Sequence, residues 1–304
     1  MKLGILDLGS NTVHLQIIDA HRGAKPIHNS SVKHQLRLID FTDENGAVSP
    51  QGVETLHKVI TDSLEKSKEY HLDEIIAFAT SALREATNCK EIISEINKIH
   101  NLNLQVLSGV DEAELTFLAV RRWLGWSSGD LLVLDIGGGS LEIAAGSDEL
   151  PDAAKSYFLG AARLTREFLK SDPFTEKSLD NLSKYLDLAM VDISNVFGPY
   201  STHKAIGTSK TFRTLARLTS DFLGDPGRTI TRKSLELLYE KISKMSIEER
   251  SNLPRVSAFR ADQIVAGSLV ALKVMQSLDL NVIEISPWAL REGIVLNRID
   301  IIKF

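Results

Sequence analysis

Apolar and polar positions near the N-terminus follow a short period that predicts a β-hairpin. An apolar run at residues 3–6 ends in Asp7, a small polar turn follows, and apolar side chains resume at residues 13–18. Short apolar runs bounded by small and polar residues are typical of strands. The same criterion predicts strands near Val32–Ile39 and Glu74–Thr80. The chain therefore opens as strand, tight turn, strand.

Much of the remaining chain has helical periodicity, interrupted by further short strands. Between residues 50 and 70 the apolar side chains recur at the spacing of an amphipathic helix. Further helices are expected at residues 90–100, 112–124, 164–169, 177–197, 211–222, 234–245, 261–278 and 290–301, and further strands at residues 104–107, 203–206 and 281–286. Strands and helices mix throughout, so the fold class is α/β.

The opening hairpin pattern occurs a second time. An apolar strand at residues 131–134 ends in Asp135, a glycine turn follows, and a second strand returns. Asp7 and Asp135 are 128 residues apart (135 − 7). One copy per predicted domain indicates a duplicated α/β fold, whose two halves present equivalent loops to an active-site cleft between the domains.

A break of small residues around Gly125 separates the two copies and gives the expected domain boundary. The first domain then covers residues 1–125 and the second residues 126–304. The closing helix, about residues 290–304, is a candidate to pack back on the first domain.

Composition narrows the class of protein. The 304 residues carry a formal charge of −5, and 43% of them are hydrophobic, which is the balance of an ordinary globule. The negative charge argues against a nucleic-acid partner. Cys89 is the single cysteine, so no internal disulfide or cysteine-based metal cluster can form. With no signal-peptide core and no apolar run of about 18 residues, we expect a cytoplasmic protein without a membrane partner.

Three glycine- or small-residue turns are candidate phosphate loops. Glycine lets the backbone approach a ligand closely, and the N–H groups of such a turn can cradle phosphate oxygens. The turn after Asp135 holds three consecutive glycines, more than a plain hairpin needs. The turn after Asp7 alone also fits a plain hairpin. A third turn, at residues 207–211, leads from a strand into a helix, whose N-terminus attracts anions.

Two charged positions between the repeats add candidate chemistry. Glu112 follows a glycine turn and opens a helix, where a carboxylate can simply favour the first turn or can activate a water that attacks phosphorus. Arg84 lies in the turn after a predicted strand. Its guanidinium suits phosphate, although a solvated surface arginine is the alternative.

Six segments together give a specific resemblance. They are Asp7–His14 (DLGSNTVH), Ala79–Arg84 (ATSALR), Ser108–Ala113 (SGVDEA), Asp135–Glu142 (DIGGGSLE), Gly207–Thr211 (GTSKT) and Ala289–Gly293 (ALREG). In order and spacing this series resembles the exopolyphosphatase and guanosine pentaphosphate phosphatase family, within the actin-like ATPase superfamily. The resemblance implies two duplicated actin-like (ribonuclease H-like) domains.

The resemblance also implies roles for matching residues. Glu112 corresponds to the catalytic glutamate that orients or activates the attacking water. Asp135 and Glu142, with Asp7 in the equivalent place of the first loop, correspond to ligands of Mg²⁺, with Mn²⁺ as an alternative. The implied phosphate-binding residues are Gly9, Ser10, Asn11, Arg84, Gly137, Gly138, Gly139, Ser140, Thr208, Ser209 and Lys210.

The expected activity is Mg²⁺-dependent release of terminal orthophosphate from inorganic polyphosphate, with short chains favoured because no appended domain is present to hold a long one. Family members commonly have glycine where this chain has Lys210, which disfavours purine recognition and offers a cation to a phosphate chain. Hydrolysis of the 5′-γ-phosphate of guanosine pentaphosphate is the alternative. A kinase of the same superfamily and a non-catalytic polyphosphate or nucleotide sensor are two further alternatives. We also expect a homodimer.

Charge is distributed unevenly along the chain. Residues 201–260 contain 12 Lys and Arg against 6 Asp and Glu, a net of +6, whereas residues 108–155 contain 3 against 9, a net of −6. The basic segment is expected to guide a polyanion towards an acidic, metal-holding centre.

Overall fold

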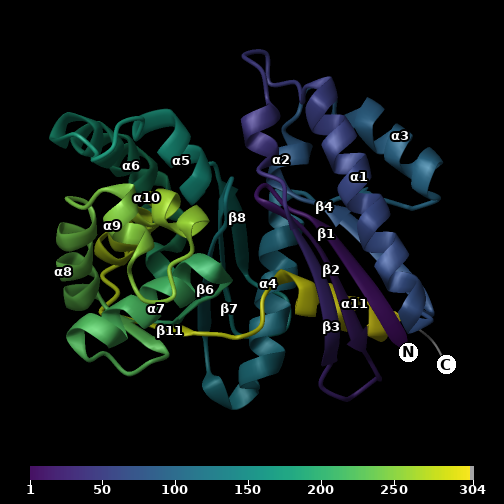
Figure 1. The fold of residues 1–304 in the computed structure, drawn as a ribbon. Coiled ribbons are helices and arrows are strands. Elements are labelled where there is room, and N and C mark those ends of the chain that lie inside the picture. Colours follow the sequence, from purple (N-terminus) through teal and green to yellow (C-terminus); the bar gives the residue numbers. More distant parts are fainter. Residues whose placement is uncertain (302–304) are drawn as a thin grey trace. The chain divides into compact units, whose positions relative to one another are not determined.

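The computed structural model describes residues 1–301 and divides into two compact units (Figure 1). The first unit joins Met1–Leu115 to the C-terminal segment from Leu290, and the second comprises Thr116–Ala289. Residues 302–304, the end of the closing helix expected at 290–304, lie outside the described residues.

The division differs from the boundary expected at Gly125. It falls inside helix α4 (Gly109–Leu124) because this continuous helix begins among the contacts of the first unit and ends among those of the second. The last helix, α11 (Leu290–Ile301), belongs with the first unit. The glycine break after α4 therefore ends a helix without separating the two units.

The first unit is built on a five-stranded sheet in the order β3-β2-β1-β4-β5. Its strands are β1 (Lys2–Leu8), β2 (Thr12–Asp19), β3 (Ile27–Gln35), β4 (Glu74–Ala79) and β5 (Gln105–Val106). β1 pairs antiparallel with β2 and parallel with β4, which itself pairs parallel with β5. The carboxyl ends of β1, β4 and β5 therefore lie at one edge of this sheet.

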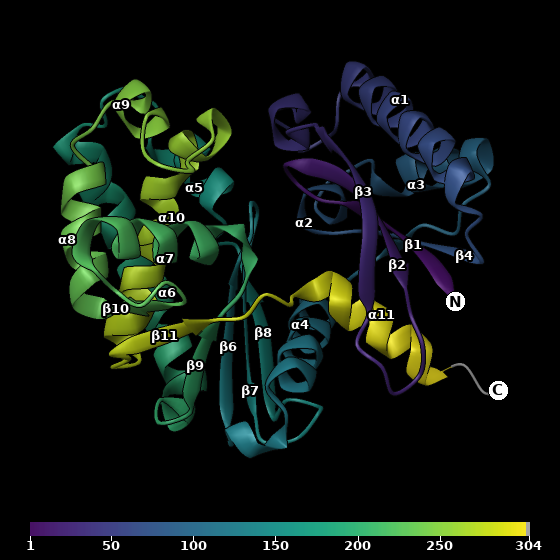
Figure 2. The ribbon, with the colours of Figure 1, turned by 60° about the horizontal axis from the view of Figure 1, so that its bottom comes forward.

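Helices cover both faces of the first sheet. Its helical elements are η1 (Leu38–Phe41), α1 (Pro50–Ser67), η2 (Lys68–Tyr70), α2 (Ser81–Arg84), α3 (Cys89–His100), the start of α4, and α11. One core cluster joins sheet residues such as Leu6 to Ile60 of α1 and Ile96 of α3. Another joins Ile5 on the other face to Val295 of α11. The first unit is thus a three-layer α/β/α arrangement (Figure 2).

The second unit has a six-stranded sheet in the order β10-β11-β9-β6-β7-β8. Its strands are β6 (Leu131–Ile136), β7 (Leu141–Gly146), β8 (Ala153–Tyr157), β9 (Lys204–Gly207), β10 (Thr229–Thr231) and β11 (Val282–Ile285). The order of the first sheet is reproduced in the second. In this comparison β6 corresponds to β1, β7 to β2, β8 to β3, β9 to β4 and β11 to β5. The pairings also agree, because β6 is antiparallel to β7 and parallel to β9. The predicted duplication is confirmed.

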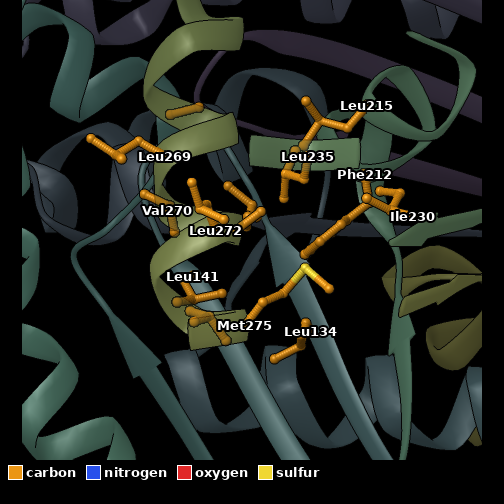
Figure 3. Packing of buried hydrophobic residues seen from close by; sticks show 14 of the residues in the cluster. Leu134, Leu141, Phe212, Leu215, Ile230, Leu235, Leu269, Val270, Leu272 and Met275 are labelled. Atoms are coloured by element: carbon orange, nitrogen blue, oxygen red, sulfur yellow. The ribbon is translucent and has the colours of Figure 1, made fainter. Parts of the chain in front are cut away.

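The core of the second unit forms around α10. The helical elements of this unit are η3 (Trp126–Ser128), α5 (Ala161–Phe168), α6 (Glu176–Phe197), η4 (Gly198–Tyr200), α7 (Ser209–Leu223), α8 (Arg232–Ile242), α9 (Ile247–Ser251) and α10 (Ala258–Ser277). Figure 3 shows Leu272 and Met275 of α10 among Leu134 of β6, Phe212 of α7 and Leu235 of α8. α10 is buried on nearly every side, and its sequence therefore has no continuous polar face.

Two details of the first unit differ from the sequence expectations. The strand expected at Val32–Ile39 is β3 (Ile27–Gln35), and Leu38 and Ile39 lie in the short helix η1. They are buried there because their side chains enter the core without continuing the sheet.

No helix within residues 1–301 is long and apolar enough to cross a membrane.

Candidate active site

The first candidate loop connects β1 to β2 and is held from behind by backbone hydrogen bonds. The N–H of Gly9 donates to the carbonyl of Thr12 at 3.0 Å and closes the turn. The N–H groups of residues 36–38, just after β3, donate to the carbonyl oxygens of Ser10 and Asn11 at 3.0–3.2 Å. In a trans peptide the C=O and N–H point in opposite directions. The loop therefore turns N–H groups away from residues 36–38, as a phosphate cradle requires.

The second candidate loop connects β6 to β7 and is built in the same way. The N–H groups of residues 161–163, which open α5, donate to the carbonyl oxygens of Gly137 and Gly138 at 2.9–3.0 Å. Gly160 contacts the loop so closely that a Cβ there would overlap the backbone of Gly139 and Ser140. In both units the segment after the third strand orients the loop of the hairpin.

Glu112 is buried at the start of α4 and forms an ion pair with Arg84. Its exposure is 7%, and Nη1 of Arg84 donates to its Oε1 as well as to the carbonyl of Leu107 at 2.8 Å. Ser108 and Asp111 cap the helix, because the Ser108 hydroxyl accepts from the N–H of Asp111 and the Asp111 carboxylate accepts from the N–H of Ser108. Asp111 thus caps the helix, while Arg84 orients the Glu112 carboxylate.

The Asp7 carboxylate forms an ion pair with a residue far along the chain. Nε of Arg291, in the first turn of α11, donates to its Oδ2 at 2.9 Å. Gly293, two residues further on, lies so close to α4 that a Cβ would overlap the Leu115 carbonyl oxygen. Asp7, expected as a metal ligand, therefore has a cationic partner from the protein itself.

Asp135 and Glu142 lie side by side on β6 and β7. They are directly opposite in the antiparallel register, so their side chains are on the same face of the sheet. The hydroxyl of Thr208 donates to Asp135, and that of Ser156 donates to Glu142 at 2.7 Å. Two adjacent carboxylates, both oriented by hydroxyl donors, are a suitable pair of oxygen ligands for a hard divalent cation.

The pair of carboxylates at Asp135 and Glu142 fits Mg²⁺ without a larger acidic cluster. Within residues 1–301 no group of three or more His, Cys, Asp or Glu side chains is arranged to hold a metal ion. Mg²⁺ is usually held by one or two carboxylates together with waters and substrate phosphates. Asp135 and Glu142 are a pair of carboxylates of that size.

The third candidate loop leads from β9 into α7. Ser209 has a φ of 64°, which is uncommon for a residue with a side chain. Its hydroxyl oxygen is buried and has no hydrogen-bond partner within residues 1–301. A strained residue with an unsatisfied buried hydroxyl at a helix N-terminus is typical of a ligand-binding position. Thr208, in contrast, donates both its N–H, to Leu134, and its hydroxyl, to Asp135.

Two arginines lie near each other at the starts of α7 and α10. Burial, and to a lesser degree the neighbouring Arg213 guanidinium, lowers the pKa of Arg260 to about 10. Arg213 donates Nε to the carbonyl of Ser209 at 2.9 Å, which links it to the third loop. Two close cations beside a candidate phosphate loop favour an anionic ligand.

Within each unit the structure brings the predicted residues to one edge of the sheet. In the first unit the loop after β1, Arg84 after β4 and Glu112 after β5 lie at the carboxyl ends of parallel strands. In the second unit Asp135 lies near the carboxyl end of β6, and the third loop follows the parallel strand β9. Sequence reasoning missed the roles of Arg291 and Ser156. Arg291 lies inside the segment Ala289–Gly293 that supports the family resemblance, whereas nothing in the sequence pattern indicates a role for Ser156.

Comparisons with known proteins agree with this architecture. Exopolyphosphatase 1 of Mycobacterium tuberculosis is 47% identical over 305 residues, which cover 99% of this chain and 89% of the relative. A crystal structure of an exopolyphosphatase from Cytophaga hutchinsonii superposes with a TM-score of 0.89 at 25% identity and covers 100% of this chain and 99% of the other.

A more distant relative is named as a pyrophosphatase of a guanosine nucleotide. The guanosine-5′-triphosphate,3′-diphosphate pyrophosphatase of Aliivibrio fischeri is 23% identical over 97% of this chain and 59% of its own length. The similarity to solved structures confirms the expected two-domain α/β fold. A sequence model of the Ppx/GppA phosphatase family matches residues 17–301, and the chain belongs to this family.

Proposed function

We propose that this protein is an exopolyphosphatase that releases terminal orthophosphate from inorganic polyphosphate. The observation that carries the proposal is the pair of hairpin loops whose carbonyls are held from behind, one in each unit, with a buried and oriented Glu112 in the first. The relative with 47% identity is named an exopolyphosphatase. Loop N–H groups bind phosphate oxygens, and an oriented carboxylate suits water activation.

In the proposed reaction water attacks the terminal phosphorus and the bridging P–O bond breaks. Glu112 orients this water and accepts its proton, while the electron pair of the broken bond leaves on the shortened chain. Arg84 holds Glu112 through Nη1 and has further N–H donors for the terminal phosphoryl oxygens. Loop N–H groups stabilise the charge that develops on those oxygens.

Asp135 and Glu142 are the proposed ligands of Mg²⁺ or Mn²⁺, and Thr208 and Ser156 position them. A divalent cation at this position would neutralise phosphate charge. Asp7 has a different proposed role. Its ion pair with Arg291 fixes α11 beside the first loop, so we assign it to positioning.

Polyphosphate is favoured over guanosine pentaphosphate by the charges near the third loop. Lys210 opens α7, and Arg213 and Arg260 add two close cations from α7 and α10. Successive cations suit a ligand that carries negative charge along its whole length. The distant similarity to a guanosine pentaphosphate enzyme keeps that substrate as the second candidate.

Substitution of Glu112 by Gln tests the proposal. Gln preserves the size of the side chain but cannot accept the proton, so we expect kcat for orthophosphate release to fall by roughly 10²–10⁴ while KM changes little. Near wild-type turnover would remove Glu112 from the mechanism. Binding of polyphosphate without phosphate release by the wild-type protein would favour a sensor, and transfer to an acceptor hydroxyl would favour a kinase.

A substrate comparison decides between the two hydrolase activities. Initial rates are measured with polyphosphates of increasing length and with guanosine pentaphosphate, each with Mg²⁺ and with Mn²⁺. We expect a higher kcat/KM for short polyphosphates than for the nucleotide. Faster consumption of guanosine pentaphosphate than of any polyphosphate would reverse this order. A cytoplasmic location and the absence of nucleic-acid and membrane partners stay predictions.

A further inference from the structure

The carbonyl groups of the glycine loop in the second unit each have a donor, and one donor is a side chain. Backbone N–H groups at the start of α5 donate to the carbonyls of Gly137 and Gly138. The carbonyl of Gly139 instead accepts from Nε of Arg163 at 3.0 Å. Arg163 thus donates to the loop twice, because its N–H also bonds to the carbonyl of Gly138 at 3.0 Å.

The Arg163 side chain is itself held in place. Its guanidinium lies over the Phe158 ring, 5.1 Å from the centroid, and Nη1 is 3.7 Å from Oε1 of Glu167. The side chain is only 19% exposed. Cation–π contact and partial burial both limit the rotamers that a long side chain can adopt. Nε therefore donates from a fixed position.

The direction of the Gly139 carbonyl determines the direction of the next N–H. The peptide between Gly139 and Ser140 is planar, so its N–H points opposite to its C=O. We propose that Arg163 is a positioning residue that aims the Ser140 N–H at a bound phosphoryl group. This inference rests on the proposed phosphate-binding role of the loop. In the first loop the carbonyls of Ser10 and Asn11 accept from the backbone N–H groups of residues 36–38.

The test combines kinetics with amide exchange in Arg163→Met and Arg163→Lys. Met has no N–H donor, and Lys has a methylene at the position of Nε, so we expect kcat/KM for polyphosphate to fall about 10- to 100-fold, less than the loss of a direct donor. Imidodiphosphate, a non-hydrolysable probe, should protect the amides of residues 137–141 from hydrogen exchange in the wild type and much less in both variants. Glu167→Gln is the matched control, because it removes the ion pair to Arg163 but keeps the bond to Gly139.

The outcomes distinguish the positioning role of Arg163 from the proposed phosphate-binding function of the loop. Equal protection in the wild type and both variants, with kcat/KM unchanged within twofold, would overturn the role of Arg163. A wild-type protein that hydrolyses polyphosphate while imidodiphosphate leaves residues 137–141 unprotected would overturn the proposed loop function instead. Loss of protection in the variants with an unchanged denaturation midpoint supports positioning, since a merely structural residue would lower the midpoint first.

A second inference concerns an exposed apolar stripe on α6. Leu188 is 76% exposed, Val191 is 61% exposed and Tyr185 is 37% exposed, whereas the opposite side of the helix carries core residues such as Leu186. Spacings of three residues place the stripe along one face of the helix. An apolar stripe in this position favours contact with another protein surface.

The charges beside the stripe fit a second copy of the same chain. Lys184, which donates to Asp180 of the same helix at 2.6 Å, lies four residues before Leu188, and Asp192 lies four residues after it. In an antiparallel pair of α6 helices centred on Leu188, each Lys184 faces the partner's Asp192 and each Tyr185 faces the partner's Val191. We infer that α6 forms a two-fold interface between copies of this chain. The carboxylate of Asp192 already accepts from Lys155 and Tyr157, and it has lone pairs for one more donor.

Matched leucines test this interface. The mass of the wild type in solution is measured by sedimentation across protein concentrations, and dimerisation is expected. Leu188→Lys should shift the protein to monomer. Leu150→Lys should not, because Leu150 is a loop residue of nearly equal exposure, 74%, outside α6. Lys184→Glu should weaken the dimer by placing like charges opposite each other. A monomeric wild type, or a dimer that survives Leu188→Lys, would overturn the inference.

Discussion

At the scale of single residues, the two hairpins share a backbone but differ in chemistry. Asp7 faces His14 across the first hairpin, and Asp135 faces Glu142 across the second, at the same position of the register. The second pair suits a divalent cation, whereas Asp7 pairs with Arg291. Duplication therefore preserved the loop geometry, while the chemistry of the paired side chains diverged between the two units.

Gly160 is the residue at which loop geometry depends most directly on a missing side chain. A Cβ there would overlap the backbone of Gly139 and Ser140. We expect Gly160→Ala to displace the loop, to lower kcat/KM by more than tenfold, and to lower the free energy of unfolding by roughly 1–3 kcal/mol. Denaturant titration and polyphosphate kinetics measure the two effects.

Gly198→Ala is the control for that substitution. No heavy atom outside its immediate chain neighbours lies within 4 Å of the position that its Cβ would take, and its φ of −52° suits any residue. Activity and stability should therefore stay close to the wild type. If both alanine variants behave alike, close packing against the loop is not what Gly160 provides.

At the scale of elements, the helices and strands that could be predicted are those indicated by neighbouring residues in the sequence. Both hairpins were found because an apolar run, an aspartate and a glycine turn are neighbours in the chain. β8 was not predicted, because this edge strand is only half-buried along its length and carries no alternating apolar pattern. The pair of Asp7 and Arg291 joins residues 284 positions apart, and no periodicity reports such a contact.

A pair of histidines links α1 to α3 beside their shared apolar core. Nδ1 of His57 and Nε2 of His100 are 2.9 Å apart, and Glu95 of α3 lies 3.4 Å from Nε2 of His57. This hydrogen bond needs one ring nitrogen as an acceptor, so it fails when both rings are protonated. Burial, and secondarily His57, lowers the pKa of His100.

Because the pKa of His100 is lowered in the folded state, the direction in which stability changes with pH is determined. The unfolded chain binds more protons than the folded one once the pH falls below about 6.5, so stability decreases as the pH is lowered through that value. We expect the free energy of unfolding to drop between pH 7 and pH 5, and His100→Gln to make the drop smaller. His28→Gln, at an exposed position of β3, should leave it unchanged. A drop of the same size in His100→Gln would contradict this assignment.

At the scale of the whole molecule, the unequal charge of two segments matters more than the net charge of −5. The basic segment, residues 201–260, contains the third loop and the pair of Arg213 and Arg260. The acidic segment, residues 108–155, contains Glu112, Asp135 and Glu142. A polyanion is attracted by the basic segment and repelled by the acidic one, which is consistent with the proposed divalent cation at Asp135 and Glu142.

Salt dependence follows from this distribution of charge. Long-range attraction between the basic segment and a long polyphosphate is screened beyond about 10 Å at 0.1 M salt. We therefore expect kcat/KM for a long chain to fall steeply between low and high salt while kcat changes little, because steering acts on encounter and not on the chemical step. Tripolyphosphate, with fewer charges, should show a shallower slope, and a long-chain kcat/KM that is independent of salt would exclude steering by residues 201–260.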